Sequence, residues 1–251
     1  MSSPITKVQL FVTCIVDSLY PSVGEAVVRV LERLGIEVEF PQAQTCCGQP
    51  GYNAGFRPEA RRLALNFMNV FEQSPAPIVT PSGSCGAMIV HGYIDLFANE
   101  PANLARARKL AARTFEFSQF LTQVLKIDPA EAAAGGRLDG AVTFHPSCHL
   151  LRGLGVSEAG PALLAAVPGA QVVPLPSAEQ CCGFGGLFAI KHSDISAAML
   201  DNKLAAVKQT GAPTVVGCDM SCLMHMQGGL DRDGSAVRCR HLAEVLSPGE
   251  A

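Results

Sequence analysis

Short apolar runs and amphipathic segments alternate along this chain, and their order occurs twice. The runs VQLFVTC and AVTFHPSC are typical of buried strands, and each of them ends at a cysteine. After each run, apolar residues recur at three- and four-residue spacing, which predicts a helix over Val23–Leu34 and another over Ala159–Val167. This repeated order of local patterns indicates two copies of one supersecondary unit.

The pattern continues in step through the rest of each copy. We expect second strands at Val38–Pro41 and Val172–Pro176, long helices at Pro58–Phe71 and Ser193–Gln209, and third strands at PIVTPS and PTVVGC. Strand, helix, strand, helix and strand in succession are typical of a parallel α/β unit with right-handed crossovers. The predicted fold class is therefore α/β, with two tandem, pseudo-symmetric parallel-sheet domains of three strands each.

A segment without a counterpart in the other copy separates the two units. The pattern is helical from about Asn103 to Leu125, and the stretch that follows is rich in alanine, proline and glycine, which favours a linker. We predict a first domain over residues 1–127, a linker over residues 128–140 and a second domain over residues 141–251.

Composition and charge argue against several classes of function. The 251 residues carry a net charge of −3 without any cluster of lysine or arginine, so binding to a nucleic-acid backbone is not expected. No apolar stretch has the length of a membrane span. The N-terminal apolar run lacks a signal-peptide cleavage site, so we interpret it as a strand. We expect a cytoplasmic protein whose association with a membrane depends on partners.

The cysteines follow the repeat. In the first copy 31 residues separate Cys14 from a CCG motif, and in the second copy 32 residues separate Cys148 from another. From the second cysteine of each motif to the last cysteine of each set there are 37 and 39 intervening residues. The two candidate ligand sets are Cys14, Cys46, Cys47 and Cys85, and Cys148, Cys181, Cys182 and Cys222. Because the strands deliver them at their carboxyl ends, each set is expected to converge on one site.

The spacing of these thiols indicates the kind of metal site. A C-x2-C motif, which is typical of mononuclear zinc sites, does not occur in the sequence. Adjacent cysteine side chains tend to diverge, so they suit different metals or edges of a polynuclear iron–sulfur cluster better than one small ion. The glycine of each motif lets the backbone approach such a bulky group. Zinc and simple thiol redox chemistry stay open as alternatives.

Three further residues are candidates for the same chemistry. Cys218 stands close to Cys222 and is either an extra ligand or a buried thiol at the end of a strand. His145 and His149 flank Cys148 and either donate hydrogen bonds to sulfur or pack at a strand-to-helix turn. Cys239 has no counterpart in the first copy, and we interpret it as structural.

The duplicated CCG motif, together with TPSGSCGAMI, FHPSCHLLRG and DMSCLMHMQGG, resembles the CCG cysteine-rich domains of the lactate-utilisation protein A family. The CCG-containing component of heterodisulfide reductase and the iron–sulfur component of glycolate oxidase are related to that family. The resemblance covers nearly the whole chain. It implies an iron–sulfur electron-transfer subunit of a bacterial complex that oxidises L-lactate to pyruvate, with one cluster, of 4Fe-4S type, in each domain.

The same resemblance implies that other subunits of a lactate-utilisation complex are the partners, since the sequence has no flavin or nicotinamide fingerprint. One departure affects the cluster type. Ser82 and Asp219 stand where the heterodisulfide reductase type carries a fifth cysteine, which leaves four thiols in each set. The alternative functions are a heterodisulfide-reductase-like thiol/disulfide redox subunit and a zinc-bound structural subunit.

Overall fold

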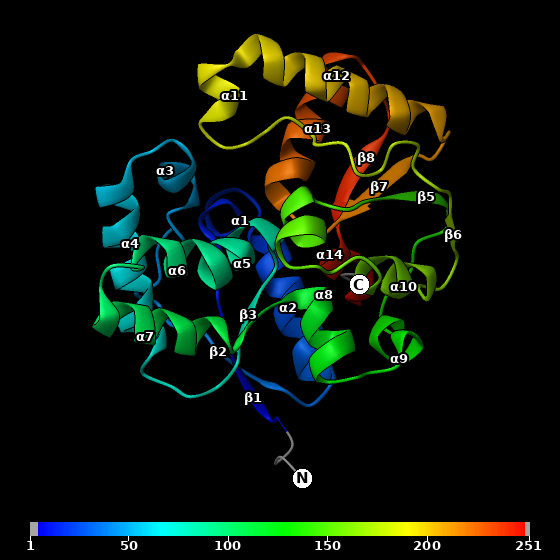
Figure 1. Ribbon diagram of the computed structural model, residues 1–251. Helices are drawn as coiled ribbons and strands as arrows, with labels where there is room; N and C mark the ends of the chain where they lie inside the picture. Colours follow the sequence, from blue (N-terminus) through cyan, green and yellow to red (C-terminus); the bar gives the residue numbers. More distant parts are fainter. Residues whose placement is uncertain (1–4, 249–251) are drawn as a thin grey trace.

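The computed structural model describes residues 5–248, which form two four-stranded sheets surrounded by helices (Figure 1). The strands are β1 (Lys7–Leu10), β2 (Glu37–Glu39), β3 (Ile78–Thr80), β4 (Thr114–Glu116), β5 (Gly140–His145), β6 (Ala170–Val172), β7 (Thr214–Gly217) and β8 (Arg238–His241). The strand order is β2-β1-β3-β4 in the first sheet and β6-β5-β7-β8 in the second.

The helices of the first half precede the fifth strand. They are α1 (Cys14–Leu19), α2 (Pro21–Arg33), α3 (Gln49–Asn53), α4 (Arg57–Phe71), α5 (Gly83–Ala87), α6 (Tyr93–Leu96), α7 (Pro101–Ala111), α8 (Phe117–Gln119) and α9 (Pro129–Ala133), with π-helical turns η1 (Met88–Gly92) and η2 (Phe120–Val124). The second half has α10 (Ala159–Ala165), α11 (Phe188–Lys191), α12 (Ser193–Gln209), α13 (Met220–Arg232), α14 (Leu242–Leu246) and the π-helical turn η3 (His149–Gly153).

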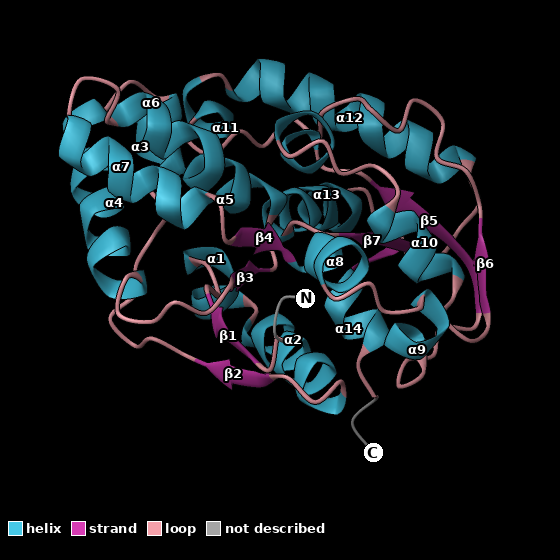
Figure 2. Cartoon of the chain, turned by 60° about the horizontal axis from the view of Figure 1, so that its bottom comes forward, coloured by secondary structure: helices cyan, strands magenta, loops and turns pink. Residues whose placement is uncertain are grey.

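The predicted fold class is confirmed, since every strand pair in both sheets is parallel (Figure 2). The long helix expected at Ser193–Gln209 has these bounds in the structure, and the one expected at Pro58–Phe71 begins one residue earlier. Equivalent strands hold equivalent positions in the two sheets: β1 is an inner strand of the first sheet, and β5 is an inner strand of the second. This arrangement directs the carboxyl ends of β1, β3, β5 and β7 toward the cysteines that follow them.

The expected number of strands was wrong, because each sheet has a fourth strand. β4 lies within the segment predicted to be helical, and β8 contains Cys239. Both strands are too short to show an alternating pattern, and pairing with β3 and β7 defines them. The strand expected at Val172–Pro176 ends at Val172 because pairing with β5 ends there, and Pro174 has no N–H to extend the ladder.

Helices of each half pack against helices of the other. The last helix of the second half, α14, packs on α2, and α8 of the first half packs on α10. One continuous apolar core contains Val8 of the first strand and Leu246 near the end of the chain. The α9 helix lies in the stretch 128–140, and its Ala132 and Ala133 are buried in this core. The division into residues 1–127 and 141–251 stays a prediction.

A close contact between α5 and η3 joins the halves beside the cysteines. A Cβ atom at Gly83 would lie 2.6 Å from Cβ of Leu150 and 2.9 Å from Oγ of Ser147. The two elements can approach this closely because Gly83 has no side chain. Next to them, Ser82 and Asp219 form an isolated antiparallel bridge between the halves.

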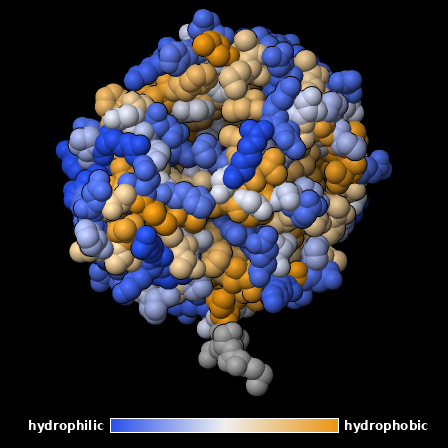
Figure 3. All heavy atoms as spheres, in the orientation of Figure 1, coloured by the Kyte–Doolittle hydropathy of each residue, from blue (hydrophilic) through white to orange (hydrophobic). Residues whose placement is uncertain are grey.

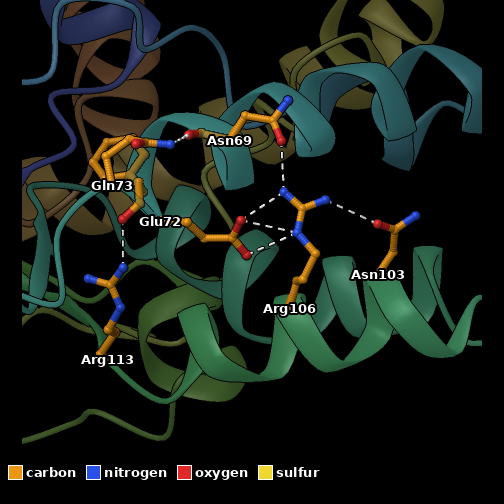
Figure 4. Close-up of polar contacts among 7 residues, drawn as sticks. Asn69, Glu72, Gln73, Asn103, Arg106 and Arg113 are labelled. Carbon is orange, nitrogen blue, oxygen red and sulfur yellow. Dashed lines mark hydrogen bonds and ion pairs between the residues drawn. The ribbon is translucent and has the colours of Figure 1, made fainter.

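Polar contacts fasten the outer helices of the first half (Figure 4). The guanidinium of Arg106 on α7 donates hydrogen bonds to the carboxylate of Glu72 and to Oδ1 of Asn69, which lie at and near the end of α4. The Arg113 guanidinium donates to the carbonyl of Phe71. These contacts hold α7 against α4, the long helix of the first half. Among residues 5–248, none of the helices combines the length and the apolar character that crossing a bilayer requires.

Candidate metal centre

The cysteines that the sequence singled out all lie at the carboxyl ends of central strands or in the CCG loops. Cys14 begins α1 directly after β1, and Cys85 lies in α5 after β3. Cys148 precedes η3 after β5, and Cys222 lies in the first turn of α13 after β7. The two CCG pairs occupy the loops before α3 and α11.

In the first half, the four thiols form a connected cluster. The sulfurs of Cys47 and Cys85 are 3.2 Å apart, and the backbone N–H of Gly48 donates to Sγ of Cys46 across 3.4 Å. The thiol of Cys14 interacts with that of Cys46, which raises the pKa of Cys14 and lowers that of Cys46. Gly48 reaches this position with a φ of +86°, a conformation that favours glycine. The structure therefore brings together the complete predicted set of the first half.

The second half reproduces this arrangement. The backbone N–H of Gly183, with a φ of +91°, donates to Sγ of Cys181 across 3.4 Å. The thiol of Cys181 interacts with those of Cys148 and Cys182, which lowers the pKa of Cys181 and raises the pKa values of the other two. The sulfurs of Cys182 and Cys222 and a ring nitrogen of His145 lie within 4.8 Å of one another. The predicted set of the second half is also complete, and a buried imidazole lies beside it.

Both thiol sets line the same cavity, which has a volume of about 120 Å³ and opens to solvent. Its walls contain the eight cysteines of the two sets, the glycine-rich loop Phe184–Gly186 and the polar residues Thr13, Gln49, Asn53, Ser82, Ser84, Ser147, His149, Asp219 and Ser221. Figure 3 shows one face of the molecule, on which hydrophilic residues are interspersed with smaller apolar patches. The two sets are thus neighbours across a shared space, which the sequence did not predict.

Hydrogen bonding makes one thiol of each set easy to ionise. Bonds from the thiols of Cys14 and Cys47 lower the pKa of Cys46 to about 3. Bonds from the thiols of Cys148 and Cys182 lower the pKa of Cys181 to about 2. The donating thiols of Cys14 and Cys148 have raised pKa values for the same reason. Four thiolates so close together repel one another unless cations lie among them.

This donor set fits a soft, thiolate-bound metal group. Each half offers four cysteine sulfurs on the wall of one cavity, and one backbone N–H group donates to one of them. Thiolates select zinc, copper(I) and iron–sulfur clusters among biological metals. Backbone donors to ligand sulfurs are a common feature around clusters, because they stabilise the negative charge on sulfur. The arrangement therefore suits a thiolate-ligated metal group.

The additional candidates from the sequence have different surroundings. His149 lines the cavity, with Nδ1 3.6 Å from Sγ of Cys148. His145 is buried, and both of its ring nitrogens lack a hydrogen-bond partner within residues 5–248. Cys218 is buried in the core and does not line the cavity, and burial raises the pKa of its thiol well above the ordinary value. Cys239 lies on β8, away from the cavity lining.

Sequence reasoning missed two features of the site. Asp219, which it treated as the position of an absent thiol, is buried and accepts hydrogen bonds from both halves. Lys203 on α12 is also buried, with its ammonium donating to the carbonyl oxygens of Ser177 and Ala178. A lysine on the apolar face of a long helix is a signal that could have been noticed, because lysine is rarely buried without partners.

Comparisons with known proteins agree with the duplicated arrangement. The family model described as a cysteine-rich domain, CCG, matches residues 8–90 and 142–227. The "Lactate utilization protein A" of Geobacillus kaustophilus is 46% identical over 96% of this chain and 98% of its own length. The protein of the same name from Macrococcus caseolyticus is 48% identical over 96% of each chain.

A solved structure has a similar fold. The crystal structure of a hypothetical protein from Helicobacter pylori superposes with a TM-score of 0.63 at 9% sequence identity. The alignment covers 99% of this chain and 50% of that one, so this chain spans half the length of the solved protein. At this low identity the similarity concerns the fold alone.

Proposed function

The chain belongs to the lactate utilization protein A family of duplicated CCG proteins, and on this basis we propose that it is an iron–sulfur electron-transfer subunit of a multi-protein system that oxidises L-lactate to pyruvate. The observation that carries the proposal is the pair of four-thiol sets on one cavity. The names of the relatives support the lactate part of the proposal, and the donor chemistry supports the iron–sulfur part.

The chain's own residues have defined parts in this function. The cysteines of the first half would hold one cluster and those of the second half another. A cluster bound in this way supplies reversible one-electron transfer. The N–H groups of Gly48 and Gly183 stabilise negative charge on Cys46 and Cys181, whose lowered pKa values keep both sulfurs ready to bind metal. Hydride or proton removal from a hydroxy acid is assigned to partner proteins.

Anaerobic purification tests the proposal directly. We expect a brown protein with about four or eight irons per chain and a matching amount of acid-labile sulfide. Cys239→Ser is the matched control, because Cys239 lies outside the cavity lining, and this variant should keep its iron. A colourless chain that carries zinc in place of iron contradicts the proposal and favours the zinc-bound structural subunit.

A second candidate function is the direct reduction of a disulfide by the metal centres. The observation that favours it is the cavity, which is open to solvent and has both thiol sets in its walls, so that a small molecule can enter between them. Mixing the loaded protein with its partner subunits and L-lactate distinguishes the two. Lactate-dependent bleaching of the cluster absorbance supports the first function, whereas oxidation of the reduced protein by an organic disulfide supports the second.

A further inference from the structure

The two halves are built alike around their thiols, so their residues can be compared position by position. Phe11 lies three residues before Cys14, and His145 lies three residues before Cys148. Both residues lie at the carboxyl end of a central strand. Phe11 comes directly after Leu10, the last residue of β1, which pairs with Val79, and His145 is the last residue of β5. His145 therefore occupies in the second half the position that Phe11 occupies in the first.

A second pair of equivalent positions lies on the long helices. A Cβ atom at Gly48 would meet the carbonyl of Ala60 on α4, and one at Gly183 would meet the carbonyl of Ser196 on α12. These contacts align the two helices, with residue 60 matching residue 196. Seven residues further along, Phe67 of α4 therefore matches Lys203 of α12.

In the first half, these two positions form part of an aromatic cluster. The rings of Phe11 and Phe67 are in edge-to-face contact, with centroids 5.0 Å apart, and Tyr93 packs against Phe67 at 5.5 Å. The sulfurs of Cys47 and Cys85 belong to the same buried apolar cluster. The first thiol set therefore lies against a surface that offers neither a cation nor an imidazole from these positions.

In the second half, the same two positions hold polar side chains. The ammonium of Lys203 donates hydrogen bonds to two carbonyl oxygens at 3.1 and 3.0 Å, which stabilise its charged form. Burial lowers the pKa of Lys203, and the neighbouring sulfurs of Cys182, Cys181 and Cys222 act in the opposite direction. His145 lies close to Cys182 and Cys222 with its ring nitrogens free of other partners in the described chain.

We propose that Lys203 and His145 raise the reduction potential of the centre in the second half above that of the centre in the first half. This proposal rests on the function proposed above. Reduction adds one negative charge, which a buried ammonium stabilises through a medium of low dielectric constant. An imidazole N–H that donates to a cluster sulfur acts in the same direction. One electron then passes from the first centre, which is oxidised, to the second, which is reduced, without any bond being made or broken.

The direction of transfer follows from this difference. With both centres present, electrons would move from the first half to the second. Lys203 and His145 are positioning and tuning residues in this scheme, because they act on the potential through the ligand sulfurs. Phe11 and Phe67 occupy the same positions in the first half without charge, so the reduction potential of the first centre serves as the reference for that of the second.

A redox titration of the anaerobically isolated, iron-loaded protein, followed by electron paramagnetic resonance, tests the inference. Cys46→Ser and Cys181→Ser, each retaining one centre, assign the two potentials. We expect the second centre to be favoured at least tenfold for one-electron reduction, which corresponds to about 59 mV. Lys203→Met should lower the potential of the second centre only, and Lys203→Arg should restore it. Phe67→Met, the matched control, should leave the second centre unchanged.

The outcomes separate this inference from the proposed function. Equal potentials, a higher potential in the first half, or a second centre that Lys203→Met does not shift would overturn the inference while leaving an iron–sulfur protein. Absence of iron from the wild-type protein would overturn the proposed function itself. If Lys203→Met fails to fold, His145→Phe, which copies the residue of the first half, must lower the potential of the same centre for the inference to stand.

Discussion

Replacing Asp219 by alanine perturbs the polar contact that joins the two halves beside the cavity. Its carboxylate accepts hydrogen bonds from Oγ of Ser82 at 3.1 Å and from the backbone N–H of Ser84 at 2.8 Å, both of which belong to the first half. It also caps α13 by accepting from the backbone N–H and hydroxyl of Ser221. Asp219→Ala removes all of these acceptors and leaves their donors behind.

The structure sets the size of the expected effect. A hydrogen bond to a charged group contributes about 1.5–3 kcal/mol, and two of the bonds cross between the halves. Water from the adjoining cavity can accept hydrogen bonds from Ser84 and Ser221 once the carboxylate is gone. Each lost bond should therefore cost an amount at the lower end of this range. Asp219→Ala should therefore lower the free energy of unfolding by about 3 kcal/mol. Ser82→Ala removes the bond to Asp219 and also the N-cap of α5, in which Oγ of Ser82 accepts from the backbone N–H of Cys85, and it should cost about 2 kcal/mol.

Urea-induced unfolding under anaerobic conditions, followed by circular dichroism, measures these differences in the free energy of unfolding. The double variant with Ser82→Ala and Asp219→Ala gives the coupling energy between these two side chains. Asp201→Ala is a control, because the Asp201 side chain is 59% exposed and its ion pair with Arg232 should be worth less than about 1 kcal/mol. An Asp219→Ala protein as stable as the wild type refutes the bridging role. Loss of iron from the second half without loss of stability identifies Asp219 as a metal ligand instead.

Three further predictions concern the same structure. Burial raises the pKa of Glu116 from 4.5 to about 7, so the folded state binds a proton more tightly than the unfolded state does. The free energy of unfolding should therefore fall by about 3 kcal/mol as the pH rises from 4.5 to 7. Urea titrations at several pH values measure this dependence, which Glu116→Gln should abolish. Gly83→Ala should destabilise the protein by about 1–3 kcal/mol by forcing α5 away from Leu150, whereas Gly228→Ala, with open space around it, should be neutral or slightly stabilising in thermal melts. Cys46→Ser and Cys182→Ser should each lose metal from their own half, so that iron analysis gives half the wild-type content, and a loss from both halves would contradict two separate centres.

Local patterns in the sequence were sufficient to predict most of the architecture. The helix of residues 57–71 is amphipathic, the helix of residues 193–209 is a long stretch without proline or glycine, and the central strands are apolar runs. These are local signals, so they do not depend on the tertiary context. The short strands β4 and β8 have no such pattern, because pairing with an existing neighbour is what makes them strands. Element boundaries set by partners were therefore the part of the fold that a single sequence could not supply.

The cysteine spacing likewise determined which thiols belong together, because parallel strands in known order bring their carboxyl ends to one edge of a sheet. Tertiary structure alone decided that both sets line one cavity, since this depends on how two distant halves pack through α5 and η3. It also decided that Asp219 bridges the halves and that Lys203 matches Phe67, whereas the match of His145 with Phe11 follows from the cysteine spacing. Such contacts join residues more than fifty positions apart, and no periodicity along the chain records them.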